Sequence, residues 1–586
     1  MTVTKKLNLI LCWHMHQPDY RHHATGEFAL PWTYLHAIKD YTDMAFHVES
    51  HRQAKAVFNF VPVLLDQLED YARQFSENKI RDPLLKLLTV KNLDTLPEKQ
   101  HKFILDSCFR SNHSKMIQPY PAYKRLYDLF KLHDEHGAGH LGYFSGQYLG
   151  DLLVWYHLVW MGESVRRESE LVAGLMTKGC HFTPEDRQRL FGLIGELIRE
   201  VIPRYKKLAQ AGQIELSTTP YYHPISPLLL DFDSARESVP GTSLPVSTAY
   251  PGGESRVKFH VGAAAESHQR RFGERPQGMW PAEGGISQAF AVLLAKQGCR
   301  WAATGEGVLV NSLRKAQPDQ PLPDKSAYLY RPYRVADGAH EIMCFFRDDR
   351  LSDLIGFEYA KWFGKDAVSN FVHALEEIWR QSPDHESPVV SVILDGENAW
   401  EYYPYNGYYF LSELYGALEE HPFIQMTTFK DYLDSCQSNQ RHLQLGIAEN
   451  ANASCAVPGE LPYLVAGSWV YGNFTTWIGS PEKNRAWDLL CQAKQSFDLV
   501  MASGRLSEEQ KSLAAEQLAV CEGSDWFWWF GDYNPAESVA SFDRLYRENL
   551  VDLYHLLQLP VPEALNHPIS TGGGHPEAGG AMRRAS

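Results

Sequence analysis

Short apolar runs alternate with longer amphipathic stretches over the first 430 residues of the chain. The short runs are rich in β-branched and aromatic residues and predict strands, whereas the long stretches repeat apolar residues at helical spacing. The predicted strands are Leu7–Trp13, Ala56–Phe60, Ile214–Thr218, Gly278–Trp280, Trp301–Ala303, Ile342–Phe346, Val389–Leu394 and Phe423–Thr427. Helices are predicted between them, for example over Pro184–Ala211, Ser287–Gly298 and Ala367–Gln381.

This alternation indicates an α/β fold in which parallel strands are joined by crossover helices. The number of strands suits a barrel of seven or eight. In such barrels the active site is built at the carboxyl ends of the strands. His14, His16, Glu283 and Asp395 each come just after a predicted strand, and Glu215 lies within one.

Three regions depart from the regular alternation. A helical insertion from about 80 to 200 separates the second and third strands, and residues 231–256 form a Pro- and Gly-rich excursion that either shapes the substrate cleft or lies on the surface. Beyond about 480 the pattern is helical. We therefore expect a barrel domain at 1–430, a mainly helical domain at 431–565 that completes the cleft, and a glycine-rich disordered tail at 566–586. The expected C-terminal helices are Glu482–Ala502, Ser507–Cys521 and Pro535–Leu559.

Composition narrows the class of protein. With 44% apolar and 22% charged residues, the 586-residue chain can bury a large core. Its net charge of -15 and the lack of long basic runs argue against nucleic acid, and no apolar stretch approaches the roughly 20 residues needed to span a bilayer. The nine cysteines form no C-x-x-C pair, which predicts neither a disulfide framework nor a zinc knuckle and favours a reducing, cytoplasmic location.

Two polar motifs on the early strands have open interpretations. His14 and His16 alternate along the chain and face the same side, where they could bind a metal or hydrogen-bond sugar hydroxyls. A glutamate inside an apolar strand is costly to bury unpaired, so Glu215 should contact either a structural partner or a ligand.

Two acids carry the strongest chemical signal. Glu283 follows Trp280 and precedes two glycines, while Asp395 follows the apolar run Val389–Leu394. An acid at the end of a buried strand can have the raised pKa that a general acid needs near neutral pH. One acid alone is more often a helix cap or an ion pair, but two acids facing one pocket are what glycosidic bond cleavage requires. The sequence therefore predicts an enzyme acting on carbohydrates.

Aromatic and charged residues elsewhere extend this prediction. Aromatic residues make up 12% of the chain, and indole rings suit the apolar faces of sugars. Asp525 and Trp526, arriving from the helical region, could close the cleft and stack on sugar. Arg347 could hold a carboxylate through paired hydrogen bonds, although a surface ion pair is an equal alternative.

Five segments in order make the chain resemble glycoside hydrolase family 57, a family of retaining enzymes acting on α-glucans. They are His14-Met15-His16-Gln17-Pro18, Gly212-Gln213-Ile214-Glu215, Trp280-Pro281-Ala282-Glu283, Asp395-Gly396-Glu397-Asn398-Ala399-Trp400 and Ser524-Asp525-Trp526. The last two segments look most like the α-amylase and amylopullulanase side of the family rather than its branching enzymes.

The resemblance implies a distorted, TIM-like (β/α)7 barrel followed by a helical domain, with Glu283 as nucleophile and Asp395 as general acid/base. It implies double displacement without a metal or other cofactor. It also implies that His14, His16, Glu215, Trp280 and Trp526 bind the reacting sugar, with His223 and Trp400 as weaker assignments. Retention of configuration then requires the two carboxyl groups to lie roughly 5 to 5.5 Å apart.

The leading hypothesis is thus a cytoplasmic α-glucan hydrolase that cleaves α-1,4 bonds. Whether it also cleaves α-1,6 bonds is left open. A 4-α-glucanotransferase is the nearest alternative, because a sugar hydroxyl can replace water as the acceptor. A metal-dependent hydrolase is less favoured, since the sequence around His14 and His16 supplies no full ligand set. A glucan-binding protein without activity is disfavoured by the presence of both acids. The oligomeric state is left open.

Overall fold

The computed structural model describes residues 5–135, 143–444 and 455–574. Among these residues, seven parallel strands run side by side in the order β8, β1, β2, β3, β4, β5 and β7. Their bounds are β1 Leu7–Met15, β2 Ala56–Phe60, β3 Ile214–Thr218, β4 Gly278–Met279, β5 Trp301–Thr304, β7 His340–Phe346 and β8 Val389–Asp395. A parallel bridge between Arg347 and Ser391 joins the end of β7 to β8. The strands therefore curl into the seven-stranded barrel that the sequence predicts.

Both faces of these strands are buried, which explains their nearly continuous apolar runs. Leu9, Leu11 and Trp13 belong to the core that includes the surrounding helices, whereas Ile10 and Cys12 belong to a smaller cluster with Trp280 and other residues of the barrel. Alternate residues of β1 thus face inside and outside. Packing on both faces fixes the register that brings the strand ends together.

Three short strands extend the sheet beyond the barrel. The predicted eighth strand forms as β9 (Ile424–Met426), which pairs with the start of β1. The pattern did not predict β6 (Tyr333–Asp337), which forms an antiparallel pair with β7, or β10 (Gly459–Glu460), which adds to the edge of β6. Edge strands of this kind bury little apolar surface and so leave a weak periodic signal.

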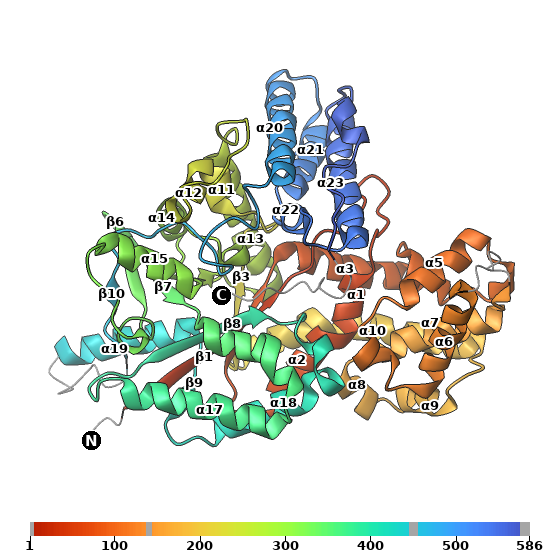
Figure 1. Ribbon diagram of the computed structural model, residues 1–586, viewed down its shortest axis with the longest axis horizontal. Helices are drawn as coiled ribbons and strands as arrows, with labels where there is room; N and C mark the ends of the chain where they lie inside the picture. Colours follow the sequence, from red (N-terminus) through yellow and green to blue (C-terminus); the bar gives the residue numbers. More distant parts are fainter. Residues whose placement is uncertain (1–4, 136–142, 445–454, 575–586) are drawn as a thin grey trace.

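Figure 1 shows helices around the barrel, a helical insertion on the right and a helical lobe at the top. The predicted helices form as α10 (Pro184–Gln210), α14 (Gln288–Lys296) and α17 (Gly364–Gln381). The insertion lies between β2 and β3 and contains α5 (Glu98–Cys108), α6 (Pro121–Glu135), α7 (Gly146–Val159), α8 (Glu163–Glu168) and α9 (Glu170–Lys178).

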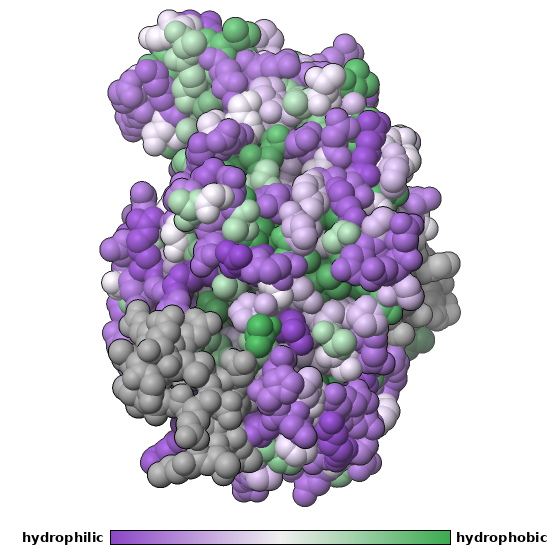
Figure 2. All heavy atoms as spheres, turned by 90° about the vertical axis from the view of Figure 1, so that its left-hand side faces the viewer, coloured by the Kyte–Doolittle hydropathy of each residue, from purple (hydrophilic) through white to green (hydrophobic). Residues whose placement is uncertain are grey.

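The helical lobe consists of α20 (Pro481–Ala502), α21 (Glu508–Cys521), α22 (Asp525–Trp529) and α23 (Ala536–Leu556). In the space-filling view this lobe stands above a notch in a largely hydrophilic face (Figure 2). The excursion at 231–256 packs on the lobe, because the backbone N–H groups of Val246 and Ser247 donate to Asp488 of α20. The domain boundaries at 430 and 565 stay predictions.

The first part of the tail that the sequence predicts to be disordered, up to residue 574, makes ordered contacts. Ile569 and Ser570 are buried, and their backbone N–H groups donate to Oδ1 of Asp543. A bridge between Pro535 and Gly574 continues the contact. Backbone hydrogen bonds to a buried carboxylate order a segment whose composition alone predicts flexibility. The rest of the expected tail, residues 575–586, lies outside the described residues.

The cysteines also give a correction. Cys436 of α19 (Phe429–Gln444) and Cys455 form one disulfide, where the sequence predicted no disulfide framework. The two residues are 19 apart in sequence with Cα atoms 5.8 Å apart. Such a pair carries no motif, because the fold rather than the spacing brings the two sulfurs together. Among the described residues, no helix is long and apolar enough to cross a membrane.

Candidate active site

The first polar residues of the site lie at one level of the barrel, on adjacent strands. His14 of β1 is level with Asn59 of β2 and Asp395 of β8, and Asn59 is level with Ser217 of β3. These residues stand near the carboxyl ends of their strands, where parallel barrels build their active sites. A cavity of about 1150 Å³ opens above this layer, and both Glu283 and Asp395 line it.

Glu283 reaches the cavity from a turn with unusual backbone geometry. It lies in a 3-10 turn, Ala282–Gly284, and has φ 57° and ψ 25° in the left-handed region. Residues with a Cβ rarely adopt this conformation, and those that do are concentrated at functional sites. Nε1 of Trp469 donates a 2.9 Å hydrogen bond to Oε2 of Glu283, which orients the carboxylate.

Asp395 is the last residue of β8 and lines the cavity beside Asn398 and Glu397. Burial raises the pKa of Asp395 to about 6, although a hydrogen bond from Asn398 and the nearby His16 and Arg347 act in the opposite direction. Nδ2 of Asn398 donates to Oδ2 of Asp395 at 3.0 Å. A carboxyl group with this pKa holds its proton close to neutral pH, as a general acid must.

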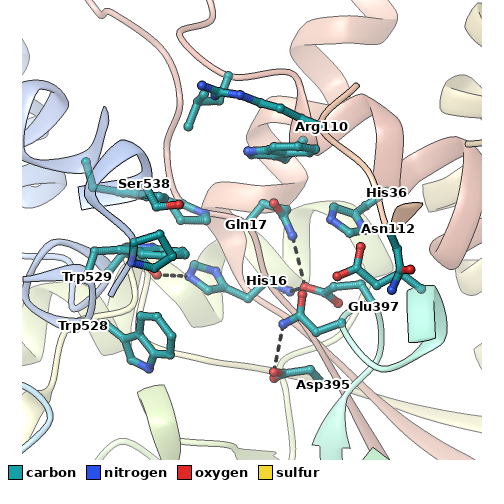
Figure 3. Close-up of a pocket in the computed structure, with 18 of the residues that line it drawn as sticks. His16, Gln17, His36, Arg110, Asn112, Asp395, Glu397, Trp528, Trp529 and Ser538 are labelled. Carbon is teal, nitrogen blue, oxygen red and sulfur yellow. Dashed lines mark hydrogen bonds and ion pairs between the residues drawn. The ribbon is translucent and has the colours of Figure 1, made fainter. Parts of the chain in front are cut away.

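Glu397 is a third carboxyl group in the cavity, and the sequence analysis gave it no role. Its Oε1 accepts hydrogen bonds from the backbone N–H of His16 and from Nε2 of Gln17 (Figure 3). Burial, and then the charge of Asp395, raise the pKa of Glu397 well above its usual value. Glu397 therefore holds the backbone of His16 and the side chain of Gln17 in place beside Asp395.

His14 at the end of β1 and His16 just after it line the cavity and contact a third histidine, His223. Nε2 of His14 lies 3.2 Å from Nε2 of His223, and the rings of His16 and His223 stack with centroids 3.8 Å apart. Burial, followed by the charge of neighbouring histidines, lowers the pKa of His14 to about 3 and that of His223 well below its usual value. Both rings are thus neutral at physiological pH.

A hydrogen-bond chain through these histidines sets their tautomers. The hydroxyl of Ser524 lies 2.9 Å from Nδ1 of His223, and Nδ1 of His14 lies 2.7 Å from Oδ1 of Asn59. Because the Asn59 oxygen is an acceptor, His14 donates from Nδ1, His223 donates to His14 from Nε2, and Ser524 donates to His223. The chain ties the helical lobe to the first two barrel strands.

The helical lobe also contributes residues directly. Oδ1 of Asp525 lies 2.8 Å from Nε2 of His16, and Asp525, Trp528 and Trp529 of α22 line the cavity. Figure 3 shows Trp528 and Trp529 beside His16, on the lobe side of the pocket. Phe109, Arg110 and Asn112 from the insertion line another part of the same cavity.

A buried ion cluster fixes this part of the lobe to the barrel. Glu522 accepts from Nε and Nη2 of Arg256, from Nε2 of His260 and from the hydroxyl of Tyr250. Burial alone would raise the pKa of Glu522, but Arg256 and His260 overcome it and hold the pKa at about 2. Glu522 precedes Ser524 by two residues, so the cluster positions the contacts of Ser524 and Asp525.

Arg347 lines the cavity but binds protein groups rather than standing free for a ligand. Its Nε donates to the carbonyl of Ile393, and its two terminal nitrogens pair with Asp349 and Asp353. Its guanidinium lies 5.5 Å from the centre of the Trp469 ring. Arg347 is buried, so its ion pairs with Asp349 and Asp353 differ from the surface ion pair that the sequence left open.

Five predicted binding residues are not among those lining the cavity: Trp526, Trp400, Trp280, His223 and Glu215. Trp526 is buried and donates to the carbonyl of Val520, and Trp400 is buried and donates to the carbonyl of Gly396. Trp280 is buried with its ring 5.2 Å from that of Trp469, so it supports the site from behind. His223 lies directly under His16.

Glu215 is positioned lower in the barrel than the sequence analysis expected. It is level with Val57 and Cys12, two residues before the layer that holds His14. Its Oε1 accepts from Nε1 of Trp301 and its Oε2 from the backbone N–H of Lys430. Burial raises the pKa of Glu215 to about 7. Glu215 lies outside the cavity lining, and these contacts favour the structural interpretation of this residue.

Trp469 is the main site residue that the sequence analysis missed. It lies in an irregular segment between β10 and α20, where neither strand nor helix periodicity marks it. The sequence around Trp469 contains Val470, Tyr471 and several glycines. A pattern of this kind is too common to identify Trp469 as a site residue.

The site contains one group of possible metal ligands within the described residues. His16, His223 and Asp525 each offer a ligand atom, and these atoms lie within 4.8 Å of one another. Neutral imidazole and carboxylate are common ligands of zinc. The sequence analysis missed this set because His223 and Asp525 are distant from His16 along the chain.

A barrel with two acids and aromatic side chains around one cleft defines a carbohydrate-processing enzyme of the glycoside hydrolase class. The chain belongs to glycosyl hydrolase family 57, whose model matches residues 10–447. This confirms the family resemblance seen in the sequence.

Solved structures share the fold at low identity. Two are family 57 branching enzymes, from Thermococcus kodakaraensis and Pyrococcus horikoshii, each 15% identical with a TM-score of 0.55. The matches cover 94% of this chain and 90% of the first, and 99% of this chain and 99% of the second. An α-amylase from Thermotoga maritima is 14% identical with a TM-score of 0.54, covering 94% of this chain and 93% of that one. No curated protein matches the chain significantly.

Proposed function

We propose that this protein is a retaining glycoside hydrolase that cleaves α-glucans through a covalent glucosyl-enzyme intermediate. The observation that carries the proposal is the unequal environment of two acids in one cavity. Glu283 is held by the Trp469 indole, whereas burial raises the pKa of Asp395 to about 6. An oriented carboxylate suits a nucleophile, and a protonated carboxyl group suits a general acid.

In the first step, Glu283 attacks the anomeric carbon while Asp395 gives its proton to the glycosidic oxygen. The bond to the leaving sugar breaks, and an ester forms between glucose and Glu283. In the second step, ionised Asp395 takes a proton from water as that water attacks the anomeric carbon. The ester breaks, Glu283 regains its charge, and Asp395 regains its proton.

The neutral rings of His14 and His223 suit the binding of an uncharged sugar. His16 faces the cavity, and His14 and His223 hold it from below through ring contacts. Imidazole and carboxylate groups at this position can share hydrogen bonds with sugar hydroxyls. The proposed substrate class, α-glucans, is supported by the family of this chain and by the α-amylase and branching enzymes that share its fold.

A product profile tests this proposal. Purified protein is incubated with maltoheptaose, pullulan and amylose, and the products and their anomeric configuration are followed by chromatography and NMR. We expect short maltooligosaccharides that are first released as α-anomers. A ladder of chains longer than the substrate would instead identify a 4-α-glucanotransferase, and the initial release of β-anomers would exclude double displacement.

Variants of the two acids test the roles within the mechanism. Glu283→Gln and Asp395→Asn should each lower turnover by roughly a thousandfold or more while the fold is retained. Azide should restore activity to Asp395→Gly and Glu283→Gly by standing in for the missing carboxylate. Near-parent activity in either single variant would overturn the assignment.

A metal-dependent hydrolase is the second candidate, favoured by the ligand set of His16, His223 and Asp525. Elemental analysis of the purified protein tests it, together with activity after chelation. Stoichiometric zinc, and activity that is lost with EDTA and regained with Zn²⁺, would support the metal mechanism. Full activity in metal-free protein would exclude it.

A further inference from the structure

Five aromatic side chains are exposed where two segments on the outside of the barrel meet. Their exposed fractions range from 37% to 70%. We call this set the aromatic platform, and its members are Trp362, Phe363, Tyr402, Tyr405 and Tyr409. Exposed apolar residues that occur singly need no explanation, but a contiguous group of large rings marks a binding surface.

Direct contacts bring the two segments together. The rings of Tyr405 and Tyr409 meet edge to face with centroids 5.4 Å apart. Gly364, which follows Phe363, is in van der Waals reach of the start of α18 (Tyr408–Glu419), because an added methyl group would lie 3.6 Å from the backbone nitrogen of Phe410. Trp362 packs on the buried Tyr359. The platform is therefore one surface built from two segments.

The structure restrains two of the five residues, Tyr409 through its hydroxyl and Tyr405 through its backbone. Nη2 of Arg167 donates to the hydroxyl of Tyr409, while Nε of the same guanidinium donates to Oε1 of Glu163. Tyr405 and Asn406 adopt left-handed backbone conformations, with φ of 54° and 53°, which are unfavourable for residues with a Cβ. Exposed rings that are held in place lose little freedom when a ligand stacks on them.

The platform continues from the cleft. Tyr402 belongs to the platform and also lines the active-site cavity. Phe357, which precedes Trp362 by five residues, lines the same cavity. Three residues after Tyr402, Tyr405 contacts Tyr409 at the start of α18, and α18 meets the segment that carries Phe363. A polymer that leaves the cleft on the side of Tyr402 would pass over these rings. Aromatic faces are well suited to the apolar faces of glucose units.

We propose that the aromatic platform is a second carbohydrate site, which binds a stretch of α-glucan chain outside the catalytic cleft. The inference rests on the proposed α-glucan activity and adds to it a preference for long chains over short ones. Each glucose unit that stacks on a ring adds affinity only when the chain is long enough to reach from the cleft to the platform.

Binding in gels that contain amylopectin tests the platform. The background is Glu283→Gln, so that the polymer is not degraded, and the test variant adds Phe363→Ala and Tyr405→Ala. Tyr143→Ala is the matched control, because Tyr143 is 78% exposed and belongs to the insertion. We expect the apparent Kd for amylopectin to rise at least fivefold in the test variant and to stay unchanged in the control. Tyr405→Trp, which keeps a large ring, should retain binding.

Kinetics in the active protein complete the test. With Phe363→Ala and Tyr405→Ala, kcat/KM for maltotriose should stay within twofold of the parent while kcat/KM for amylose falls. Unchanged amylopectin affinity would overturn the proposal, as would an equal loss on maltotriose. An equal loss of binding to a soluble β-glucan would overturn it as well, because the surface would then be non-specifically apolar. If the parent protein neither binds nor cleaves any α-glucan, the proposed function itself fails.

Discussion

Nε1 of Trp469 donates a hydrogen bond to Oε2 of Glu283 across 186 positions of sequence. The backbone N–H of Trp469 also donates to the carbonyl of Glu283. Trp469 therefore fixes the turn through its backbone and the carboxylate of the proposed nucleophile through its indole. A hydrogen bond to a charged carboxylate contributes on the order of 1.5 to 3 kcal/mol.

Replacing Trp469 with Phe keeps a ring in place and removes this donor. We expect kcat to fall by roughly 10- to 100-fold, the rate equivalent of that hydrogen bond, with a smaller change in KM. Steady-state kinetics on maltoheptaose measure both. Tyr471→Phe is a suitable control because Tyr471 is half exposed in the same segment. A kcat within twofold of the parent in Trp469→Phe would show that the indole does not serve the nucleophile.

The pH dependence of activity should report on Asp395. This residue must be protonated for the first step, and its pKa is raised to about 6, so kcat/KM should fall as pH rises through 6. The Asn398 hydrogen bond favours the ionised form of Asp395. Asn398→Ala should therefore raise the pKa of Asp395 and move the fall in kcat/KM to higher pH. If the fall in kcat/KM stays at the same pH in Asn398→Ala, a group other than Asp395 causes it.

Glu215 should make stability depend on pH without controlling the chemistry. Its pKa is about 7 in the folded chain and roughly 4.3 in an unfolded one, so the folded state binds the extra proton between these values. The free energy of unfolding should therefore decrease as pH rises from about 4.3 to 7. In Glu215→Gln this contribution should vanish, which urea unfolding at several pH values would measure. An identical pH slope in the variant would contradict the prediction.

Glu522 should be essential for attaching the lobe to the barrel. Removing one member of a buried ion pair leaves uncompensated charge and typically costs about 3 to 5 kcal/mol. Glu522→Gln should therefore lower the Tm substantially and reduce activity by displacing Asp525. Glu508→Gln, which removes the exposed pair with Lys511, is the control and should change stability by less than about 0.5 kcal/mol. Equal Tm values for the two variants would refute this role.

The sequence predicted the barrel strands well because each is buried on both faces and so carries a continuous apolar run. β1 and β8 extend only one or two residues beyond the predicted ends. The same logic placed Asp395 at a strand end. The short edge strands β6 and β10 were missed because each has little apolar surface to bury.

The site was harder to predict where function depends on distant parts of the chain. Trp469 comes from an irregular segment, and no local pattern links it to Glu283. The motif around Glu215 suggested a ligand contact, but only the register of β3 reveals that this carboxylate lies below the catalytic layer. Periodicity indicates which side of a strand a residue faces, whereas the height within a barrel depends on strand register.

The contact between His16 and Asp525 joins residues 509 positions apart. A ribosome makes the chain from its N-terminal end, so a growing chain has its barrel strands long before the segment that carries Asp525. The pocket is complete only after that segment has docked. Catalytic competence should therefore arise late in biosynthesis, and a chain cut short before α22 should be a folded barrel with an unfinished pocket.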